Sequence, residues 1–192
     1  MSDLYNFRYG KPDAKSLILM IQNHGENLIG AEIGVLRAES LCTILQTCEN
    51  VKLMYGVDSW QPYSDYLKFP YDGTPAYTVS EREIETVRFE AYHNIKWSGE
   101  QNRVKILEMD SSLAVNHIQD EELDFIFIDT YLTKEQASKD LEDWYPKVKS
   151  GGLFAGHDWD CPEIQTEVRK FRKDNNIQNR LCSFDNTWVW TK

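Results

Sequence analysis

The chain has 192 residues, of which 41% are hydrophobic and 27% charged, a composition typical of a soluble globular protein of one domain. Its formal net charge of -10 argues against the basic face that sequence-independent binding to nucleic acid or to an anionic membrane requires. No apolar run approaches the roughly 20 residues that cross a bilayer. The N-terminus also lacks the charged-then-apolar pattern of a secretory signal. We therefore expect a single cytoplasmic domain over residues 1–192.

The first third of the chain alternates between helical and strand-type patterns. Apolar residues at helical spacing predict a helix over 13–23, and a short apolar run predicts a strand over 30–35. A second amphipathic helix is expected over 39–48 and a second strand over 52–57. Cys42 and Cys48 lie in that second helix. Because the four cysteines show neither a CxxC pair nor a Cys/His zinc spacing, we expect free thiols, these two in the core.

Residues 59–102 form the longest interruption of this alternation. Their first half is rich in tyrosine, tryptophan and proline, and Ser80 to Trp97 has a helical pattern. A long aromatic segment beside a ligand site suits a substrate lid, and aromatic faces suit sugars or planar phenols. A satellite hydrophobic cluster or the contact of a homodimer is the alternative.

The rest of the chain continues the alternation. Strands are expected over 103–109, 123–128 and 153–157. The second of these is almost continuously apolar, as a strand buried on both faces should be. A capping box, Thr133 to Gln136, opens a helix that continues through Val148 and ends at Gly151-Gly152.

After the strand over 153–157, Asp160 and Glu163 suggest the start of a helix that continues to about residue 175. The last residues read as two strands around an Asp185-Asn186 turn. Five strand–helix alternations followed by a hairpin predict an α/β fold. We expect a Rossmann-like, doubly wound, mostly parallel seven-stranded sheet with a C-terminal antiparallel hairpin.

Acidic residues stand at the carboxyl ends of four consecutive expected strands, where parallel α/β sheets bind their ligands. They are Asp58, Asp110, Asp129 and Asp158, and Glu32 lies within the first strand. If the sheet brings these carboxylates to one crevice, their mutual repulsion favours a cationic or polyhydroxylated ligand.

The loop after the first strand gives a further indication. A nicotinamide dinucleotide site would have GxGxxG, whereas this loop has Gly34 and then Ala38. That favours a ligand without phosphates. Asp58 follows roughly 20 residues later, where an acidic residue can bind ribose hydroxyls, although it could also serve a turn or an N-cap. Asp110 with Ser111 could hold an adenine amino group or only cap the next helix.

Several segments resemble the successive motifs of class I S-adenosylmethionine-dependent methyltransferases, and more narrowly the small single-domain group with sugar and macrolide O-methyltransferases. They are EIGVxxxxS from Glu32, GVDSW at 56–60, LEMDSS at 107–112, LDFIFID at 123–129, and IDx₁₀DLEDW leading to KSGGLFAGHDW at 149–159. The resemblance implies the fold expected above and S-adenosylmethionine as cofactor. The cofactor-binding residues that it implies are Glu32, Gly34, Asp58, Ser59, Trp60, Asp110, Ser111 and Asp129.

By this resemblance, Glu32 and Gly34 flank the methionine end of the cofactor, Asp58 binds the ribose and Asp110 lies by the adenine. Trp60 could pack on the adenine face. The cofactor is a sulfonium cation with a ribose and no phosphate, which agrees with the acidic residues and the single-glycine loop.

Two departures from the family pattern stand out. Ala38 replaces a second glycine in the first loop, which predicts weaker or slightly shifted cofactor binding. After the fourth strand the family often has IDGDHSY, whereas this chain has Asp129-Thr130-Tyr131-Leu132. The acidic and His members of that pattern are absent.

Two arrangements could activate an acceptor hydroxyl. In related catechol-type O-methyltransferases, aspartates at the places of Asp129 and Asp158, with a following Asn, hold a divalent metal such as Mg²⁺. Here Trp159 stands in place of the Asn, and Asp160 could substitute unless it caps the next helix. His157 is the alternative, since its ordinary pKa of about 6.5 suits a general base.

These features predict an S-adenosylmethionine-dependent methyltransferase acting on a hydroxyl of a small molecule or sugar. The catalytic residues would be His157, Asp158 and Asp129, and the metal ligands Asp129 and Asp158. Two alternatives remain from the residues: a nicotinamide-dependent oxidoreductase, and a non-catalytic protein that retains the fold. N-methylation is a third outcome that no residue excludes.

Overall fold

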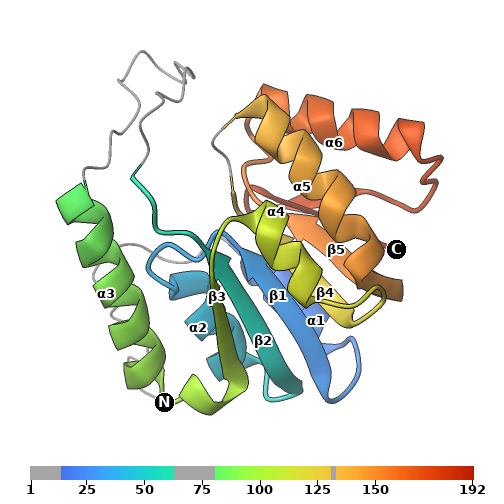
Figure 1. The fold of residues 1–192 in the computed structure, drawn as a ribbon. Coiled ribbons are helices and arrows are strands. Elements are labelled where there is room, and N and C mark those ends of the chain that lie inside the picture. Colours follow the sequence, from blue (N-terminus) through green and yellow to red (C-terminus); the bar gives the residue numbers. More distant parts are fainter. Residues whose placement is uncertain (1–13, 63–80, 131–132) are drawn as a thin grey trace.

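A computed structural model describes residues 14–62, 81–130 and 133–192 of the chain. Seven strands form one sheet in the order β3-β2-β1-β4-β5-β7-β6 (Figure 1). Their bounds are β1 Leu28–Ile33, β2 Val51–Asp58, β3 Val104–Glu108, β4 Leu123–Ile128, β5 Val148–Gly156, β6 Cys182–Phe184 and β7 Thr187–Thr191. Strands β1 to β5 pair in parallel, and β5, β7 and β6 pair antiparallel. The predicted fold class, with its C-terminal hairpin, is confirmed.

Helices cover both faces of this sheet. The helices of one face are α1 Lys15–Gln22, α2 Glu39–Thr47 and α3 Glu81–Ser98, and those of the other are α4 Ser111–Ala114, α5 Lys134–Trp144 and α6 Pro162–Asp174. Short 3-10 turns follow three elements: η1 Gln101–Arg103, η2 Val115–His117 and η3 Tyr145–Lys147. Each face has its own apolar core, and the strands contribute side chains alternately to the two. No helix in the described part of the chain is long and apolar enough to span a membrane.

The central strands carry the most buried side chains, as their sequences predict. In β4, Phe125, Ile126 and Phe127 are almost completely inaccessible to solvent. Cys42 and Cys48 are buried in the α2 core, so their predicted role as small apolar residues is confirmed. Burial raises the pKa of the Cys42 thiol to about 12 and that of the Cys48 thiol to about 11.

The structure corrects the predicted end of the helix that precedes β5. Helix α5 ends at Trp144, a 3-10 turn containing Pro146 follows, and β5 already begins at Val148. Pro146 cannot donate an amide hydrogen, which favours this early stop. Gly151 then pairs with the C-terminal residue, donating its amide hydrogen to Lys192 O at 2.8 Å. The glycines therefore lie within the strand and do not cap the helix.

The capping pair predicted at Asp160 and Glu163 is also wrong. The N-cap of α6 is Cys161, and no side chain caps it. Asp160 is turned toward the C-terminal hairpin, where its amide donates to Asn186 Oδ1 at 2.6 Å. The hairpin therefore determines the position of this residue.

The segment predicted as a lid has a different role in its described part. Helix α3 is the crossover between the parallel strands β2 and β3, and it buries Ile84, Val87, Ala91 and Ile95 in the core beside α2. It is thus a regular element of the fold. Residues 63–80, which hold most of the predicted aromatic cluster, lie outside the described residues.

Arg103 ties helix α2 to the start of β3. Its guanidinium donates to the carbonyl oxygens of Leu45, Cys48 and Val51, and its Nε donates to Glu100 at 2.8 Å. Three carbonyls at the end of α2 and the start of β2 thus share one charged donor, and Cys48 O also accepts from the Val51 amide at 3.1 Å.

We expect Arg103→Met to lower the free energy of unfolding by about 2 kcal/mol, because it leaves these half-buried carbonyls without a charged donor. Denaturant unfolding monitored by circular dichroism measures the change. Arg88→Met is the control: the Arg88–Glu108 pair is exposed and should contribute about 0.5 kcal/mol. Equal losses in the two variants would contradict this assignment.

Candidate functional site

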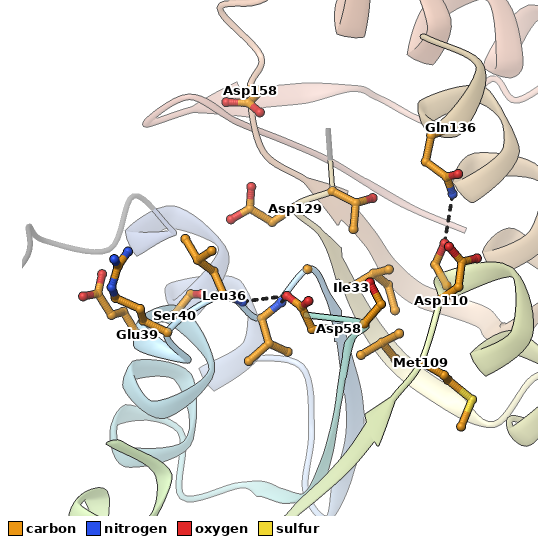
Figure 2. Close-up of a pocket in the computed structure, with 17 residues that line it drawn as sticks. Ile33, Leu36, Glu39, Ser40, Asp58, Met109, Asp110, Asp129, Gln136 and Asp158 are labelled. Atoms are coloured by element: carbon orange, nitrogen blue, oxygen red, sulfur yellow. Dashed lines mark hydrogen bonds between the residues drawn. The ribbon is translucent and has the colours of Figure 1, made fainter. Parts of the chain in front are cut away.

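The carboxyl ends of the parallel strands surround a pocket of about 330 Å³. It lies where the order of the sheet reverses, between β1 and β4. Four aspartates that follow four strands line it: Asp58, Asp110, Asp129 and Asp158. Figure 2 shows Asp129 and Asp158 on one side, Asp110 with Gln136 on the other, and Asp58 between them. The predicted convergence of acidic side chains is therefore present.

Gly34 begins the loop that follows β1, and its backbone has a φ of 90°. A Cβ atom there would lie 2.3 Å from the carbonyl oxygen of Asp129. The expectation was that Gly34 leaves room for a ligand, and it does line the pocket. The glycine is nevertheless required by the close approach of the β4 backbone as well.

Asp58 holds the same loop in place. Its Oδ2 accepts hydrogen bonds from the amides of Val35 and Leu36, at 3.0 and 2.9 Å, and its Oδ1 accepts one from the Trp60 amide at 2.8 Å. Leu36 and Trp60 both have positive φ, a conformation that costs bulky residues energy. These three hydrogen bonds help to hold the two strained residues.

Burial raises the pKa of Asp58, and the three backbone hydrogen bonds oppose the rise. Of the two roles predicted for Asp58, the turn role is the one that its hydrogen bonds display. The carboxylate nevertheless lines the pocket, and within the described residues Oδ1 accepts one hydrogen bond, which leaves acceptor capacity for a ribose hydroxyl. Ser59, the next residue, also lines the pocket.

Ala38 does not intrude into the pocket, contrary to expectation. It has a φ of 61°, is fully buried in the α2 core and is not among the residues that line the cavity. The methyl group therefore faces the protein interior, and the departure from glycine is accommodated by backbone strain.

Glu32 and Trp60 lie behind the pocket wall. Glu32 is fully buried and accepts a hydrogen bond from Ser40, which does line the pocket. Burial raises the pKa of Glu32 well above its ordinary value; the Ser40 hydrogen bond lowers it and the charges of Asp129 and Asp58 raise it further. Its Oε2 atom has no hydrogen-bond partner within the described residues.

The indole of Trp60 is 4% exposed, and its Nε1 donates to Leu36 O at 2.9 Å. Its ring lies near that of Tyr92 on α3. Trp60 does not line the pocket, which corrects the expectation that its ring packs on adenine. Its packing against the loop and α3 explains why it points into the core.

Asp110 combines the two roles left open for it. It is the N-cap of α4, accepting from the Ser112 amide at 2.9 Å, and it lines the pocket. Ser111 is buried beside it and bonds to Asp140 and Gln136 of α5. Sequence reasoning did not place Gln136, Thr130 or Asp140 at the site. The signal available was a polar residue, Asp140, on the apolar face that holds Ala137, Leu141 and Trp144.

His157, Asp129 and Asp158 form a compact group at the rim. His157 Nδ1 lies 3.3 Å from Asp129 Oδ1 and 3.1 Å from Asp158 Oδ1. Burial lowers the pKa of His157, but the hydrogen bonds and charges of the two aspartates outweigh it and raise the pKa to about 10. The two aspartates therefore favour the imidazolium form of His157, which makes it a weaker candidate for the expected role of general base than the neighbouring carboxylates.

The same three residues meet the requirements of a divalent-cation site. One ligand atom from each lies within 4.8 Å of the others, and all three side chains are partly exposed. Two carboxylates and an imidazole suit a hard or borderline divalent ion, and the cation would displace the imidazolium proton. The structure adds His157 to the metal ligands expected from sequence, Asp129 and Asp158. Trp159 and Asp160 are not part of this group.

The His157 arrangement predicts a definite pH dependence. Because the folded-state pKa is raised from 6.5 to about 10, the stabilisation is complete below pH 6.5 and is lost as the pH rises toward 10. NMR titration of the imidazole should show the high pKa. In Asp129→Asn/Asp158→Asn, burial is left unopposed and the pKa should fall below 6.5. An unchanged pKa in that variant would contradict the assignment.

Gly34→Ala tests the close approach of β1 and β4. We expect a loss of about 3 kcal/mol of unfolding free energy, from a positive φ and a clash with rigid backbone. Gly151→Ala is a matched control, since Gly151 has a φ of 85° but nothing within 4 Å of an added Cβ; it should lose about 1 kcal/mol. Thermal unfolding compares the two, and similar losses would show that the clash is relieved by loop movement.

Comparison with known proteins gives a family for this chain. The family model described as "Methyltransferase domain" matches residues 31–159, about two thirds of the chain. That range includes the second half of β1, all of β2 to β5, and all five acidic residues discussed above. A search of curated protein sequences found no significant match.

Solved structures share the fold at low sequence identity. The O-methyltransferase NovP superposes with a TM-score of 0.66 at 20% identity, covering 92% of this chain and 79% of its own. A precorrin-6y C5,15-methyltransferase from Geobacter metallireducens gives a TM-score of 0.65 at 11% sequence identity, and the match covers 99% of this chain and 94% of that protein. An S-adenosylmethionine-dependent O-methyltransferase from Thermotoga maritima gives a TM-score of 0.58 at 17% sequence identity, and the match covers 93% of this chain and 57% of that protein. The similarity extends over nearly the whole chain.

Proposed function

Because the chain belongs to this methyltransferase family, we propose that it transfers the methyl group of S-adenosylmethionine to a hydroxyl of a small molecule or sugar. The family match identifies the chain as a methyltransferase and supports S-adenosylmethionine as the donor. The family match also favours a methyltransferase over the two alternatives left open by the sequence, a nicotinamide-dependent oxidoreductase and a non-catalytic protein. The oxygen acceptor and its chemical class are the proposal.

One observation carries the proposal: the pocket at the strand ends is lined by four aspartates. Such a pocket suits a ligand that brings a positive charge and a ribose and no phosphate. A sulfonium nucleoside fits this description, whereas a dinucleotide brings a pyrophosphate that the carboxylates would repel. The volume of about 330 Å³ is at the lower end of the range for ligand sites.

Methyl transfer to oxygen is an in-line displacement. The acceptor oxygen forms a bond to the methyl carbon, and the carbon–sulfur bond breaks with its electron pair going to sulfur. The hydroxyl proton must pass to a base. With His157 protonated, the carboxylates of Asp129 and Asp158 are the groups at the rim that can accept it, and the imidazolium holds both of them in position.

Alignment of the acceptor with the methyl group supplies much of the rate in such a step. Asp129, His157 and Asp158 would hold a divalent cation if one binds. When bound, the cation would lower the pKa of the acceptor hydroxyl and fix its oxygen. Oxygen is favoured as the acceptor because a hydroxyl needs a nearby base or cation. Two of the similar structures are described as O-methyltransferases.

Calorimetry tests the donor site. The protein should bind S-adenosylhomocysteine with a micromolar or lower Kd and NADH at least about 100-fold more weakly, because the carboxylates repel the pyrophosphate. A parallel titration with Mg²⁺ measures whether the ion binds alone or only with an acceptor. Equal affinity for the two nucleotides would overturn the proposed function.

Asp158→Asn tests the acceptor side. We expect kcat/KM to fall by about 100-fold or more, through loss of a base or a cation ligand, with the affinity for S-adenosylhomocysteine changed by less than about threefold. Asp160→Asn, an exposed neighbour outside the pocket, is the control and should keep full activity. Mass spectrometry of products made with isotope-labelled methyl groups identifies the methylated atom. A labelled nitrogen or carbon would contradict the proposed acceptor.

A further inference from the structure

A buried carboxylate outside the pocket controls the side chains at one end of it. Asp140 of α5 has no exposed surface and does not line the cavity. Its Oδ1 accepts from Ser111 Oγ at 2.6 Å and from Gln136 Nε2 at 2.9 Å, and its Oδ2 accepts from Thr130 Oγ1. All three partners line the pocket, although they come from α4, the loop after β4 and α5.

Which group donates in each of these hydrogen bonds follows from which side chains carry a hydrogen that they can donate. An ionised carboxylate only accepts, so the side chains that surround Asp140 must each donate to it. The amide nitrogen of Gln136 lies 2.9 Å from both Asp140 Oδ1 and Ser111 Oγ and donates to this pair of oxygens. The nitrogen and oxygen of this amide are thereby assigned by the network.

The consequence appears on the pocket side. The hydroxyl hydrogens of Ser111 and Thr130 point to Asp140, so both oxygens offer only lone pairs to a ligand. Asp110, beside Ser111, is a carboxylate that already accepts from Ser112 and also offers only lone pairs. Three polar groups at this end of the pocket, those of Ser111, Thr130 and Asp110, are therefore hydrogen-bond acceptors. Figure 2 shows Asp110 and Gln136 on this side of the pocket.

We propose that Asp140 is a positioning residue that makes this end of the pocket accept hydrogen bonds only, and so selects a 6-aminopurine over a 6-oxopurine. The inference rests on the proposed function and takes the adenine of the methyl donor to lie at Asp110 and Ser111. An exocyclic amino group donates hydrogen bonds to such a wall. A 6-oxo group places another acceptor against it, which leaves buried acceptors without a donor.

Replacement of Asp140 by asparagine has a specific effect in this arrangement. The asparagine carbonyl can still accept from Ser111 and Gln136, but its amide nitrogen then faces Thr130 and donates to it. The Thr130 hydroxyl hydrogen is released and becomes a donor available to the pocket. The variant changes no pocket-lining side chain and hardly changes volume, so it tests polarity separately from shape.

The experiment compares S-adenosylhomocysteine with S-inosylhomocysteine, which differ at position 6 of the purine, by calorimetry on the full chain. The wild type should prefer the adenine ligand by about tenfold or more. Asp140→Asn should reduce that preference at least about fivefold. Asp143→Asn, the same change on the same helix at a residue paired with Lys139, should leave it unaltered.

A rescue variant separates polarity from general damage. Asp140→Asn/Thr130→Val removes the released hydroxyl with a similar shape, and it should restore much of the preference for the adenine ligand. Thermal unfolding confirms that each variant is folded. Equal weakening of both ligands by Asp140→Asn, with the preference unchanged, would overturn the inference while leaving the proposed function intact. Binding of neither ligand to the wild type would instead overturn the proposed function.

Discussion

The site depends on the parallel pairing of β1 with both β2 and β4. This pairing continues past the strand ends, where the Gly34 amide donates to Val57 O at 2.8 Å and the Asp129 amide donates to Ile33 O at 2.7 Å. Three loops are thereby held at one edge of the sheet, with a single glycine where two backbones meet. Most of the functional side chains discussed above are positioned by these loops or by a helix that packs against them, and His157 and Asp158 come from the loop after β5, which pairs with β4.

The carboxylates gathered at the site are each stabilised by a different kind of hydrogen-bond or charge partner. Backbone amides hold Asp58, a helix amide holds Asp110, hydroxyls and an amide hold Asp140, and the imidazolium holds the pair at the rim. Each partner limits what its carboxylate can still do. Asp58 and Asp110 remain acceptors toward a ligand, Asp140 acts only through its neighbours, and the rim pair is available for a proton or a cation.

Particular residues show where local patterns sufficed and where they failed. The capping box at Thr133 and the apolar run of β4 predicted the elements correctly, because both signals are local. The end of α5 was misjudged because β5 begins at Val148, paired with Leu123 of β4 far along the chain. The helical pattern from Ser80 to Trp97 was predicted correctly, but that this helix is the crossover between β2 and β3 depends on pairing that no local pattern records.

By itself the sequence determined the alternating order of strands and helices, the mostly parallel sheet and the set of acidic residues at its strand ends. These follow from periodicity and from the geometry that all parallel α/β sheets share. Only the tertiary structure decided which groups each carboxylate meets. Trp60 and Ala38 pack in the core, the carboxylates of Asp129 and Asp158 raise the pKa of His157, and Asp140 is buried behind the pocket. Those outcomes depend on burial and on hydrogen-bond partners distant in the chain, which a linear pattern does not record.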